Sequence, residues 1–283
     1  MAESIVNTIS HIYLSQGMER GVHLAIDVGA HLGEFSKELV DSELFGRVIA
    51  FEPNPNNADI LERLQADKRS FRVVRHALGS NVGFGSFYCD DDTATGSLLE
   101  YHAGYKSRGA VTDVIVPITT LDEYLAQEGN GSSVGLIKID AQGNDLGVLE
   151  GSARVLKQDR PFIICELIHI PLYMNQCLPE LIFNFLEAFE YKLYTIFNIH
   201  VTKEGGLAYV DALFIPKEIS VTQSQQYFQI DNLASLQERI ERLEIICEER
   251  LQLIHMLDTK LKMGALNRLF SISFIKRIVK WGR

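Results

Sequence analysis

The first 217 residues alternate between short apolar runs and longer stretches with one apolar face. The apolar runs predict strands of a parallel sheet covered on both faces, at residues 22–27, 47–52, 71–75, 134–140 and 161–166. The amphipathic stretches predict helices at residues 33–41, 55–66, 145–156 and 179–189. Residues 192–196 and 208–215 predict two closing strands. This order predicts an α/β domain over residues 1–217, with a doubly wound, mostly parallel sheet.

Two segments depart from this alternation. Residues 4–19 predict an amphipathic helix that precedes the sheet. Residues 84–88 and 111–117 predict strands on either side of a polar loop, 90–108, as a hairpin-like insertion near the site. Thr120 followed by Glu123 forms a capping box, which predicts a short helix through residue 126.

A different pattern follows residue 217. Residues 218–231 are rich in Gln and Ser and predict a linker. Over residues 232–264 apolar side chains recur at alternating three- and four-residue steps, which predicts a coiled coil. The seam predicts self-association as a homo-oligomer, a dimer or a trimer. The alternative is that its extra apolar residues pack back on the same domain.

The last segment, 265–283, contains five basic residues and no acid. Bulky apolar side chains and Trp281 accompany these charges. The combination predicts a basic amphipathic helix that contacts an anionic membrane surface. The alternative is a helix that caps the oligomer while its basic groups stay solvated.

Composition excludes several classes of protein. A formal net charge of −10 argues against a general nucleic-acid binder, which needs a basic surface to neutralise phosphates. The four cysteines are scattered without metal-ligand or CxxC spacing, which predicts a reduced, cytoplasmic protein without a disulfide framework. The first residues lack the pattern of a signal peptide. No stretch approaches the roughly 18 apolar residues of a membrane span.

The strongest chemical signal is the loop DVGAHLG, residues 27–33, between the first predicted strand and helix. Its glycines allow a tight turn and close approach to a ligand, and the following helix directs its N-terminal amides there. Glu52 ends the second predicted strand, where an acid accepts hydrogen bonds from two ribose hydroxyls. The GxGxxG spacing of dinucleotide binders is absent. These features predict a nucleoside without a phosphate tail, and we favour an adenosine that carries a cationic sulfonium.

The chain also resembles a known family. The segments DVGAHLGEFS, AFEPNPNN, HALGSNVG, TLDEYL and LIKIDAQGNDLGVLEGSARVL are similar, in order and spacing, to those of FkbM-type methyltransferases. The resemblance covers roughly residues 22–215. It implies a Rossmann-like methyltransferase fold and methyl transfer from S-adenosylmethionine, commonly to a hydroxyl of a sugar or polyketide.

The resemblance also implies roles for individual residues. The methionine and sulfonium side of the cofactor would lie against Asp27, Gly29, His31 and Gly33. The ribose would lie at Glu52, followed by Pro53 and Asn54, and the adenine at His76, Ala77 and Leu78. Asp140 would lie beside the methyl group. Ser97 belongs to the polar loop that we expect to close over the cofactor or substrate.

The sequence leaves the general base open. The family often has an acid where this chain has Gln142, so Asp140 and Glu166 become the better candidates. Lys138 and His169 also follow the fourth and fifth predicted strands, whose carboxyl ends meet at one edge. The alternative for Lys138 is an ion pair with Asp140 or Glu166. A divalent ion on Asp140, Glu166 and His169 is a further alternative, but their spacing does not support a metal site.

We therefore expect a cytoplasmic enzyme, peripheral on the inner face of the plasma membrane, that methylates a hydroxyl of a sugar or surface glycan. Two other classes remain open. One is a catalytically inactive scaffold that self-associates through its coiled coil. The other is a nucleotide-dependent oxidoreductase, which the missing GxGxxG spacing disfavours.

Overall fold

The computed structural model describes residues 5–65, 69–90, 93–105, 109–129 and 131–220. The predicted coiled coil at 232–264, the basic tail at 265–283 and most of the linker at 218–231 lie outside the described residues, so these stay predictions. No helix among the described residues is long and apolar enough to cross a membrane.

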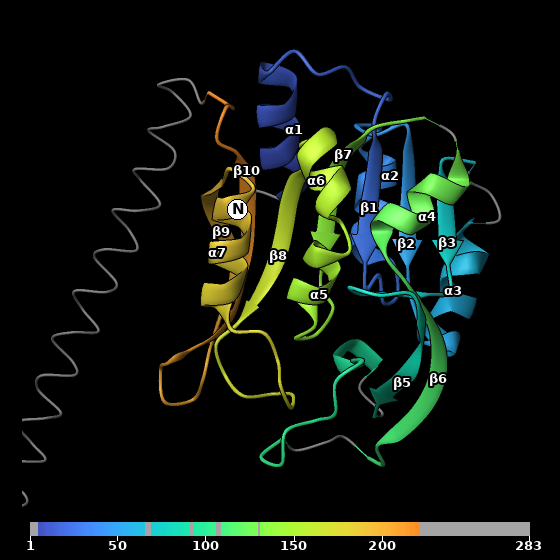
Figure 1. Ribbon diagram of the computed structural model, residues 1–283, viewed down its shortest axis with the longest axis vertical. Coiled ribbons are helices and arrows are strands. Elements are labelled where there is room, and N and C mark those ends of the chain that lie inside the picture. The colour runs from blue at the N-terminus through green and yellow to red at the C-terminus, as the bar shows by residue number, and fades with distance from the viewer. Residues whose placement is uncertain (1–4, 66–68, 91–92, 106–108, 130, 221–283) are drawn as a thin grey trace, which may run out of the picture. The chain divides into compact units, whose positions relative to one another are not determined.

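Seven strands form the main sheet in the order β3-β2-β1-β7-β8-β10-β9 (Figure 1). Their bounds are β1 Leu24–Val28, β2 Arg47–Phe51, β3 Phe71–Val74, β7 Val134–Ile139, β8 Phe162–Ile168, β9 Tyr191–Val201 and β10 Leu207–Pro216. The first five strands in this order are parallel, and β10 is antiparallel to both β8 and β9. The prediction of a Rossmann-like, mostly parallel α/β sheet is confirmed.

Helices cover both faces of this sheet because its strands are apolar on both sides. On one face pack α4 Leu121–Glu128, α5 Asp145–Glu150, α6 Ala153–Gln158 and α7 Pro179–Ala188. On the other pack α1 Ile5–Ser15, α2 Glu34–Asp41 and α3 Pro55–Gln65. The predicted helix start is confirmed, since Thr120 is the N-cap of α4 and its hydroxyl accepts a hydrogen bond from the Glu123 amide at 3.0 Å.

The prediction of one helix over residues 145–156 is wrong, because the chain breaks between α5 and α6 at Gly151. A side chain at Gly151 would overlap the backbone of Gly79. The Gly151 carbonyl accepts a hydrogen bond from the Asp122 amide at 3.0 Å. The Asp122 carboxylate then accepts hydrogen bonds from the amides of Arg154 and Val155 at the start of α6. Contacts with α4, distant in sequence, therefore divide the helix.

A second, three-stranded sheet has the order β4-β6-β5, with β4 Ala77–Leu78, β5 Gly83–Cys89 and β6 Thr112–Thr119. Strands β5 and β6 are antiparallel, which confirms the hairpin-like insertion. The segment between them holds a short 3-10 helix, η1 Thr93–Thr95. Figure 1 shows this hairpin projecting beyond the edge at which the parallel strands end.

Candidate functional site

The loop after β1 depends on two glycines with a left-handed backbone. Gly29 has φ +72°, and a Cβ there would overlap the carbonyl oxygen of Asp140 at the end of β7. Gly33 has φ +84° and caps α2, and a Cβ there would overlap the side chain of Leu61 from α3. Any other residue at these positions is strained by its backbone and meets a packed neighbour. The loop is therefore held close to β7 and α3.

Glu52 follows β2 directly and is only 3% exposed. One carboxylate oxygen accepts a hydrogen bond from the His31 amide at 2.7 Å, and the other from the Asn54 amide at 2.8 Å. Burial raises the pKa of Glu52 to about 7, although these hydrogen bonds lower it. Asn54 caps α3, since its side chain accepts a hydrogen bond from the Asn56 amide at 3.0 Å.

A pocket opens at the edge of the sheet where the parallel strands end. It lies between the ends of β1, β2 and β7 and the small sheet. It contains about 670 Å³ of space, including its open mouth. Its lining is Val28, Gly29, His31, Phe51, Glu52, Pro53, Ala77, Leu78, Phe87, Ala94, Gly96, Leu98, Asp140, Ala141, Gln142 and Asn144. The pocket thus has apolar walls with carboxylates at Glu52 and Asp140, as small-molecule sites commonly do.

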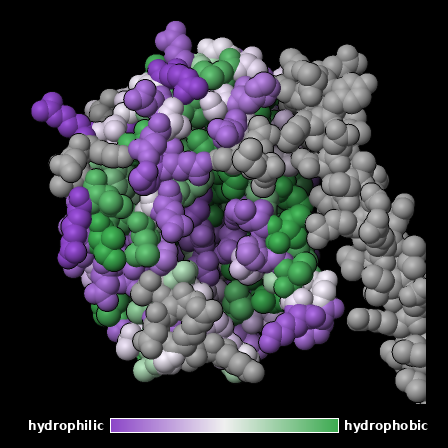
Figure 2. Space-filling model, turned by 180° about the vertical axis from the view of Figure 1, so that it is seen from behind, coloured by the Kyte–Doolittle hydropathy of each residue, from purple (hydrophilic) through white to green (hydrophobic). Residues whose placement is uncertain are grey.

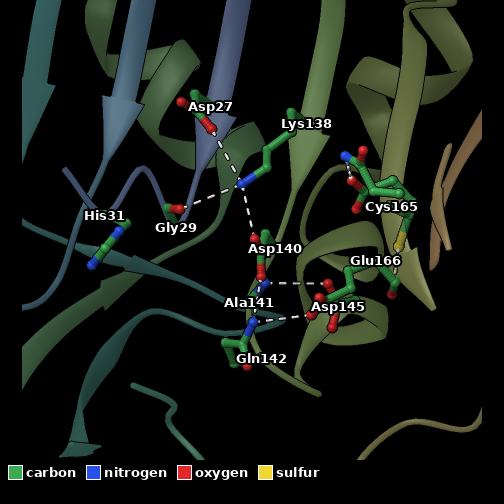
Figure 3. A network of polar contacts seen from close by, with 12 residues as sticks. Asp27, Gly29, His31, Lys138, Asp140, Ala141, Gln142, Asp145, Cys165 and Glu166 are labelled. Carbon is green, nitrogen blue, oxygen red and sulfur yellow. Dashed lines mark hydrogen bonds and ion pairs between the residues drawn. The ribbon is translucent and has the colours of Figure 1, made fainter. Parts of the chain in front are cut away.

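Lys138 of β7 lies beneath the pocket and joins two carboxylates (Figure 3). Its ammonium lies 3.2 Å from Asp140 Oδ2 and 3.7 Å from Asp27 Oδ1. Burial by itself lowers the pKa of Lys138, but the carboxylates of Asp140 and Asp27 raise it above its usual value. Asp27 is fully buried and also accepts a hydrogen bond from the Ser36 hydroxyl at 2.6 Å. Lys138 is therefore a charged ion-pair partner.

The side chain of Gln142 connects the ends of β7 and β8 (Figure 3). Its amide nitrogen donates hydrogen bonds to Asp140 Oδ1 at 2.7 Å and to Glu166 Oε2 at 3.0 Å. Its side-chain oxygen accepts a hydrogen bond from the Tyr173 hydroxyl at 2.6 Å. Its backbone carbonyl accepts one from the Ser97 hydroxyl at 2.7 Å. A glutamine is suited to this place because it donates to two acids while it accepts from a phenol.

Asp145 fixes the turn between β7 and α5. Its two oxygens accept hydrogen bonds from the backbone amides of Ala141 at 3.2 Å and Gly143 at 3.0 Å. Burial, and then the charge of Asp140, raise the pKa of Asp145 to about 7. This carboxyl holds the turn that presents Asp140 and Gln142 to the pocket.

Glu166 lies in β8 and does not line the pocket, but its Oε2 accepts a hydrogen bond from Gln142, which does. Burial raises the pKa of Glu166 well above its usual value, and the charges of Asp140 and Asp145 add to the rise. His169 follows β8 and is exposed, with its amide bonded to the Ala208 carbonyl at 2.8 Å.

The structure brings about half of the predicted site residues into the pocket. Those that line it are Gly29, His31, Glu52, Pro53, Ala77, Leu78 and Asp140. The others surround it without lining it: Asp27, Gly33, Asn54, His76, Ser97, Lys138, Glu166 and His169. Among these, Asp27, Gly33, Asn54 and Ser97 support the loops that form the pocket.

The sequence interpretation missed some walls of the pocket. Phe51 and Phe87 are buried and line it, but an aromatic residue in a strand ordinarily indicates core packing. Asn144 lines the pocket and donates a hydrogen bond to the Leu78 carbonyl at 3.4 Å. Gln142 stood out only as a departure from the family pattern, which gave no hint of its contact with Tyr173.

The described residues contain no group of three or more His, Cys, Asp or Glu side chains arranged to hold a metal ion. Of the four cysteines, the three that fall within the described part of the chain, Cys89, Cys165 and Cys177, are free thiols.

Comparison with known proteins gives the family. The FkbM methyltransferase domain matches residues 27–193. Among solved structures, an FkbM methyltransferase from Methylobacillus flagellatus shares 17% identity over 72% of this chain and 47% of that one, with a TM-score of 0.45. This chain thus covers less than half of that protein's length. No curated protein matches the chain.

Other solved methyltransferases are similar at lower identity. An rRNA methylase from Streptococcus thermophilus shares 8% identity over 76% of this chain and 98% of that one, with a TM-score of 0.45. Magnesium protoporphyrin IX methyltransferase from Synechocystis, solved with S-adenosylmethionine, shares 10% identity over 74% of this chain and 77% of that one, with a TM-score of 0.40. Because the family domain spans more than half of the sequence, the chain belongs to the FkbM family of S-adenosylmethionine-dependent methyltransferases.

Proposed function

We propose that this protein transfers a methyl group from S-adenosylmethionine to a hydroxyl of a sugar or surface glycan, with Asp140 as the general base. The observation that carries this proposal is the position of Asp140. It lines the pocket, and its two oxygens are held by the Lys138 ammonium and the Gln142 amide.

The pocket suits the cofactor at both of its polar ends. Glu52 has a buried carboxylate fixed by two backbone amides, and such a carboxylate accepts hydrogen bonds from adjacent ribose hydroxyls. Gly29 leaves the space that a Cβ would fill between the loop and β7. Asp140 supplies negative charge for the sulfonium, and Phe51 and Leu78 supply apolar surface for the adenine ring. When bound, S-adenosylmethionine supplies an electrophilic methyl group.

Among the predicted candidates, Asp140 fits the role of base best. Lys138 is unsuited because its neighbouring carboxylates keep it protonated. Glu166 and His169 are less suited because neither lines the pocket, and His169 is exposed. In the proposed reaction Asp140 takes the hydroxyl proton as the oxygen attacks. The new C–O bond forms as the C–S bond breaks, which leaves S-adenosylhomocysteine.

The partners predicted from the sequence remain part of the proposal. A homo-oligomer through residues 232–264 and membrane contact through 265–283 would hold the enzyme beside a membrane-linked glycan. Both segments lie outside the described residues.

The test is an Asp140→Asn variant, with Asp113→Asn as the matched control, because Asp113 lies at the exposed start of β6. We expect Asp140→Asn to weaken binding of cationic S-adenosylmethionine more than binding of neutral S-adenosylhomocysteine. We also expect the rate at which labelled methyl groups are transferred to a panel of acceptors to fall roughly 100-fold or more. Equal losses for both nucleosides would contradict the placement of Asp140. Cofactor binding by the wild type without transfer to any hydroxyl would favour the inactive scaffold.

A further inference from the structure

One face of the main sheet changes from apolar to polar along its strands. Near α1 the face buries apolar residues of β7, β8 and β10, which are Leu136, Phe162, Ile164, Leu213 and Ile215. One step further toward the carboxyl edge, Glu166 of β8 lies directly opposite Asp211 of β10. Tyr209 follows on the same face of β10. These polar side chains thus continue the face beyond the apolar residues that pack with α1.

The hairpin of β9 and β10 is irregular beside Asp211. Asp211 pairs with Phe197, but Tyr209 pairs with His200, so β9 has one extra residue between these pairs. Asn198 takes up the difference with a left-handed backbone, φ +47°. Its side-chain amide then donates a hydrogen bond to Asp211 Oδ2 at 2.7 Å. A bulge of this kind redirects a side chain, and here it brings an amide and a carboxyl together.

Next to this pair lies a small aromatic surface. The rings of His200 and Tyr209 are stacked, with centroids 4.3 Å apart and planes at 18°. His200 is exposed and Tyr209 is half-buried. The negative face of an aromatic ring attracts the C–H groups on the flat side of a sugar. Asp211 and Asn198 offer the acceptors and the donor that hydroxyl groups need.

This surface is continuous with the methyl-transfer pocket. Asp211 faces Glu166 across the strands, Glu166 accepts a hydrogen bond from Gln142, and Gln142 lines the pocket beside Asp140. Figure 1 shows the tip of the β9–β10 hairpin at the same edge of the sheet as the small sheet. Figure 2, which views the molecule from behind, shows a hydrophilic strip between two hydrophobic areas.

The charges of this surface disfavour an anionic ligand. Asp140, Glu166 and Asp211 form a row across three neighbouring strands, and the Lys138 ammonium is already paired with Asp140 and Asp27. Burial and then the charge of Asp140 raise the pKa of Asp211 despite its hydrogen bond from Asn198. A carboxylate on the ligand would likewise be repelled by the negative charge of Asp140.

We propose that Asn198, His200, Tyr209 and Asp211 form the subsite that binds an uncharged sugar ring of the acceptor. The inference rests on the proposed function, since it assigns the acceptor side of the same site. The ring stacks on the His200–Tyr209 pair and its hydroxyls bond to Asp211 and Asn198.

Two probes of similar shape test the subsite: methyl α-glucopyranoside, which is neutral, and methyl α-glucuronoside, which is anionic. Their binding to protein saturated with S-adenosylhomocysteine is measured by saturation-transfer NMR. We expect the neutral glycoside to bind at least about fivefold more tightly than the anionic one. We expect Tyr209→Ala and Asp211→Asn each to weaken binding of the neutral glycoside at least about fivefold.

Matched controls are Tyr88→Ala and Asp113→Asn on the small sheet, which leave glycoside binding unchanged. His200→Ala serves as a second variant if Tyr209→Ala does not fold, because His200 is exposed. Calorimetry with S-adenosylhomocysteine accompanies each variant, and we expect its affinity to be unchanged.

The outcomes separate the subsite from the proposed function. Failure of the wild type to bind S-adenosylhomocysteine contradicts the proposed function. If the nucleoside binds, three results overturn the subsite: glycoside affinity unchanged in the variants, tighter binding of the anionic glycoside, or no binding of either glycoside.

Discussion

The two halves of the pocket edge hold their charged groups in different ways. At β1 and β2, Glu52 is held by backbone amides of His31 and Asn54, from the loops that follow these two strands. At β7 and β8, Asp140 is held by the side chains of Lys138 and Gln142. Gln142 in turn depends on Glu166 and Tyr173, which lie 24 and 31 residues away in the chain.

We call the β1–β2 side the cofactor half and the β7–β8 side the acceptor half, after the roles proposed for them, and the difference shows which half depends on side chains. Backbone amides are present in every sequence, so the cofactor half needs only its glycines and one acid to form. The acceptor half needs several side chains that fit one another, and a single substitution changes its charge and shape.

The sharpest way to break the acceptor half is Lys138→Met. Lys138 is only 14% exposed and neutralises Asp27, which is fully buried. Removal of one partner leaves a buried charge, so we expect the free energy of unfolding to fall by about 3–5 kcal/mol, measured by denaturant titration. The double variant Asp27→Asn/Lys138→Met should recover part of this loss.

The matched control is Lys37→Met, because Lys37 forms an exposed ion pair with Asp41. An exposed pair contributes about 0–1 kcal/mol, so this variant should be nearly as stable as the wild type. A loss at Lys138 no larger than that at Lys37 would show that the buried ion pair is unimportant.

Gly29→Ala breaks the cofactor half through its backbone. The left-handed conformation costs an alanine about 1–2 kcal/mol, and overlap with the Asp140 carbonyl adds roughly 1–3 kcal/mol. We expect a loss of about 3 kcal/mol in the free energy of unfolding, together with weakened nucleoside binding. Gly17→Ala isolates the backbone cost, because Gly17 has φ +75° with open space around it. Equal losses in the two variants would contradict the close approach of the loop to β7.

The smallest expected effect is the change of nucleoside affinity with pH that follows from protonation of Glu52. The ionised carboxylate is the form that accepts hydrogen bonds from both ribose hydroxyls, and its pKa is about 7. Affinity for S-adenosylhomocysteine should therefore fall as the pH decreases below about 7, by up to about tenfold per pH unit. Glu52→Gln should remove this dependence. A flat affinity profile in the wild type between about pH 5.5 and pH 8 would contradict the role of Glu52.

The same pKa affects stability in the opposite direction. The pKa of Glu52 is about 7 in the folded protein against an ordinary value of 4.5. Its contribution to the stability of the unliganded protein is therefore full below about pH 4.5 and is lost as the pH rises through about 7. The functional carboxylate thus costs stability at the pH at which it binds.

The same contrast explains what the sequence could predict. The glycine loop and Glu52 were found because strand-end acids and left-handed glycines leave a local pattern. The contact of Gln142 with Tyr173 and the bulge at Asn198 leave none, since they arise only when distant strands pair. The break between α5 and α6 was missed for the same reason, because Asp122 of α4 supplies its hydrogen bonds.

Calorimetric titration tests whether Glu52 holds the nucleoside of S-adenosylmethionine. The wild type is titrated with S-adenosylmethionine, S-adenosylhomocysteine and NAD, beside Glu52→Ala and a Glu62→Ala control on the exposed side of α3. We predict that the two sulfur nucleosides bind and NAD does not. Glu52→Ala should weaken binding about 100-fold, and Glu62→Ala should leave it unchanged. Binding of NAD alone, or unchanged affinity in Glu52→Ala, would contradict the placement of this nucleoside at Glu52.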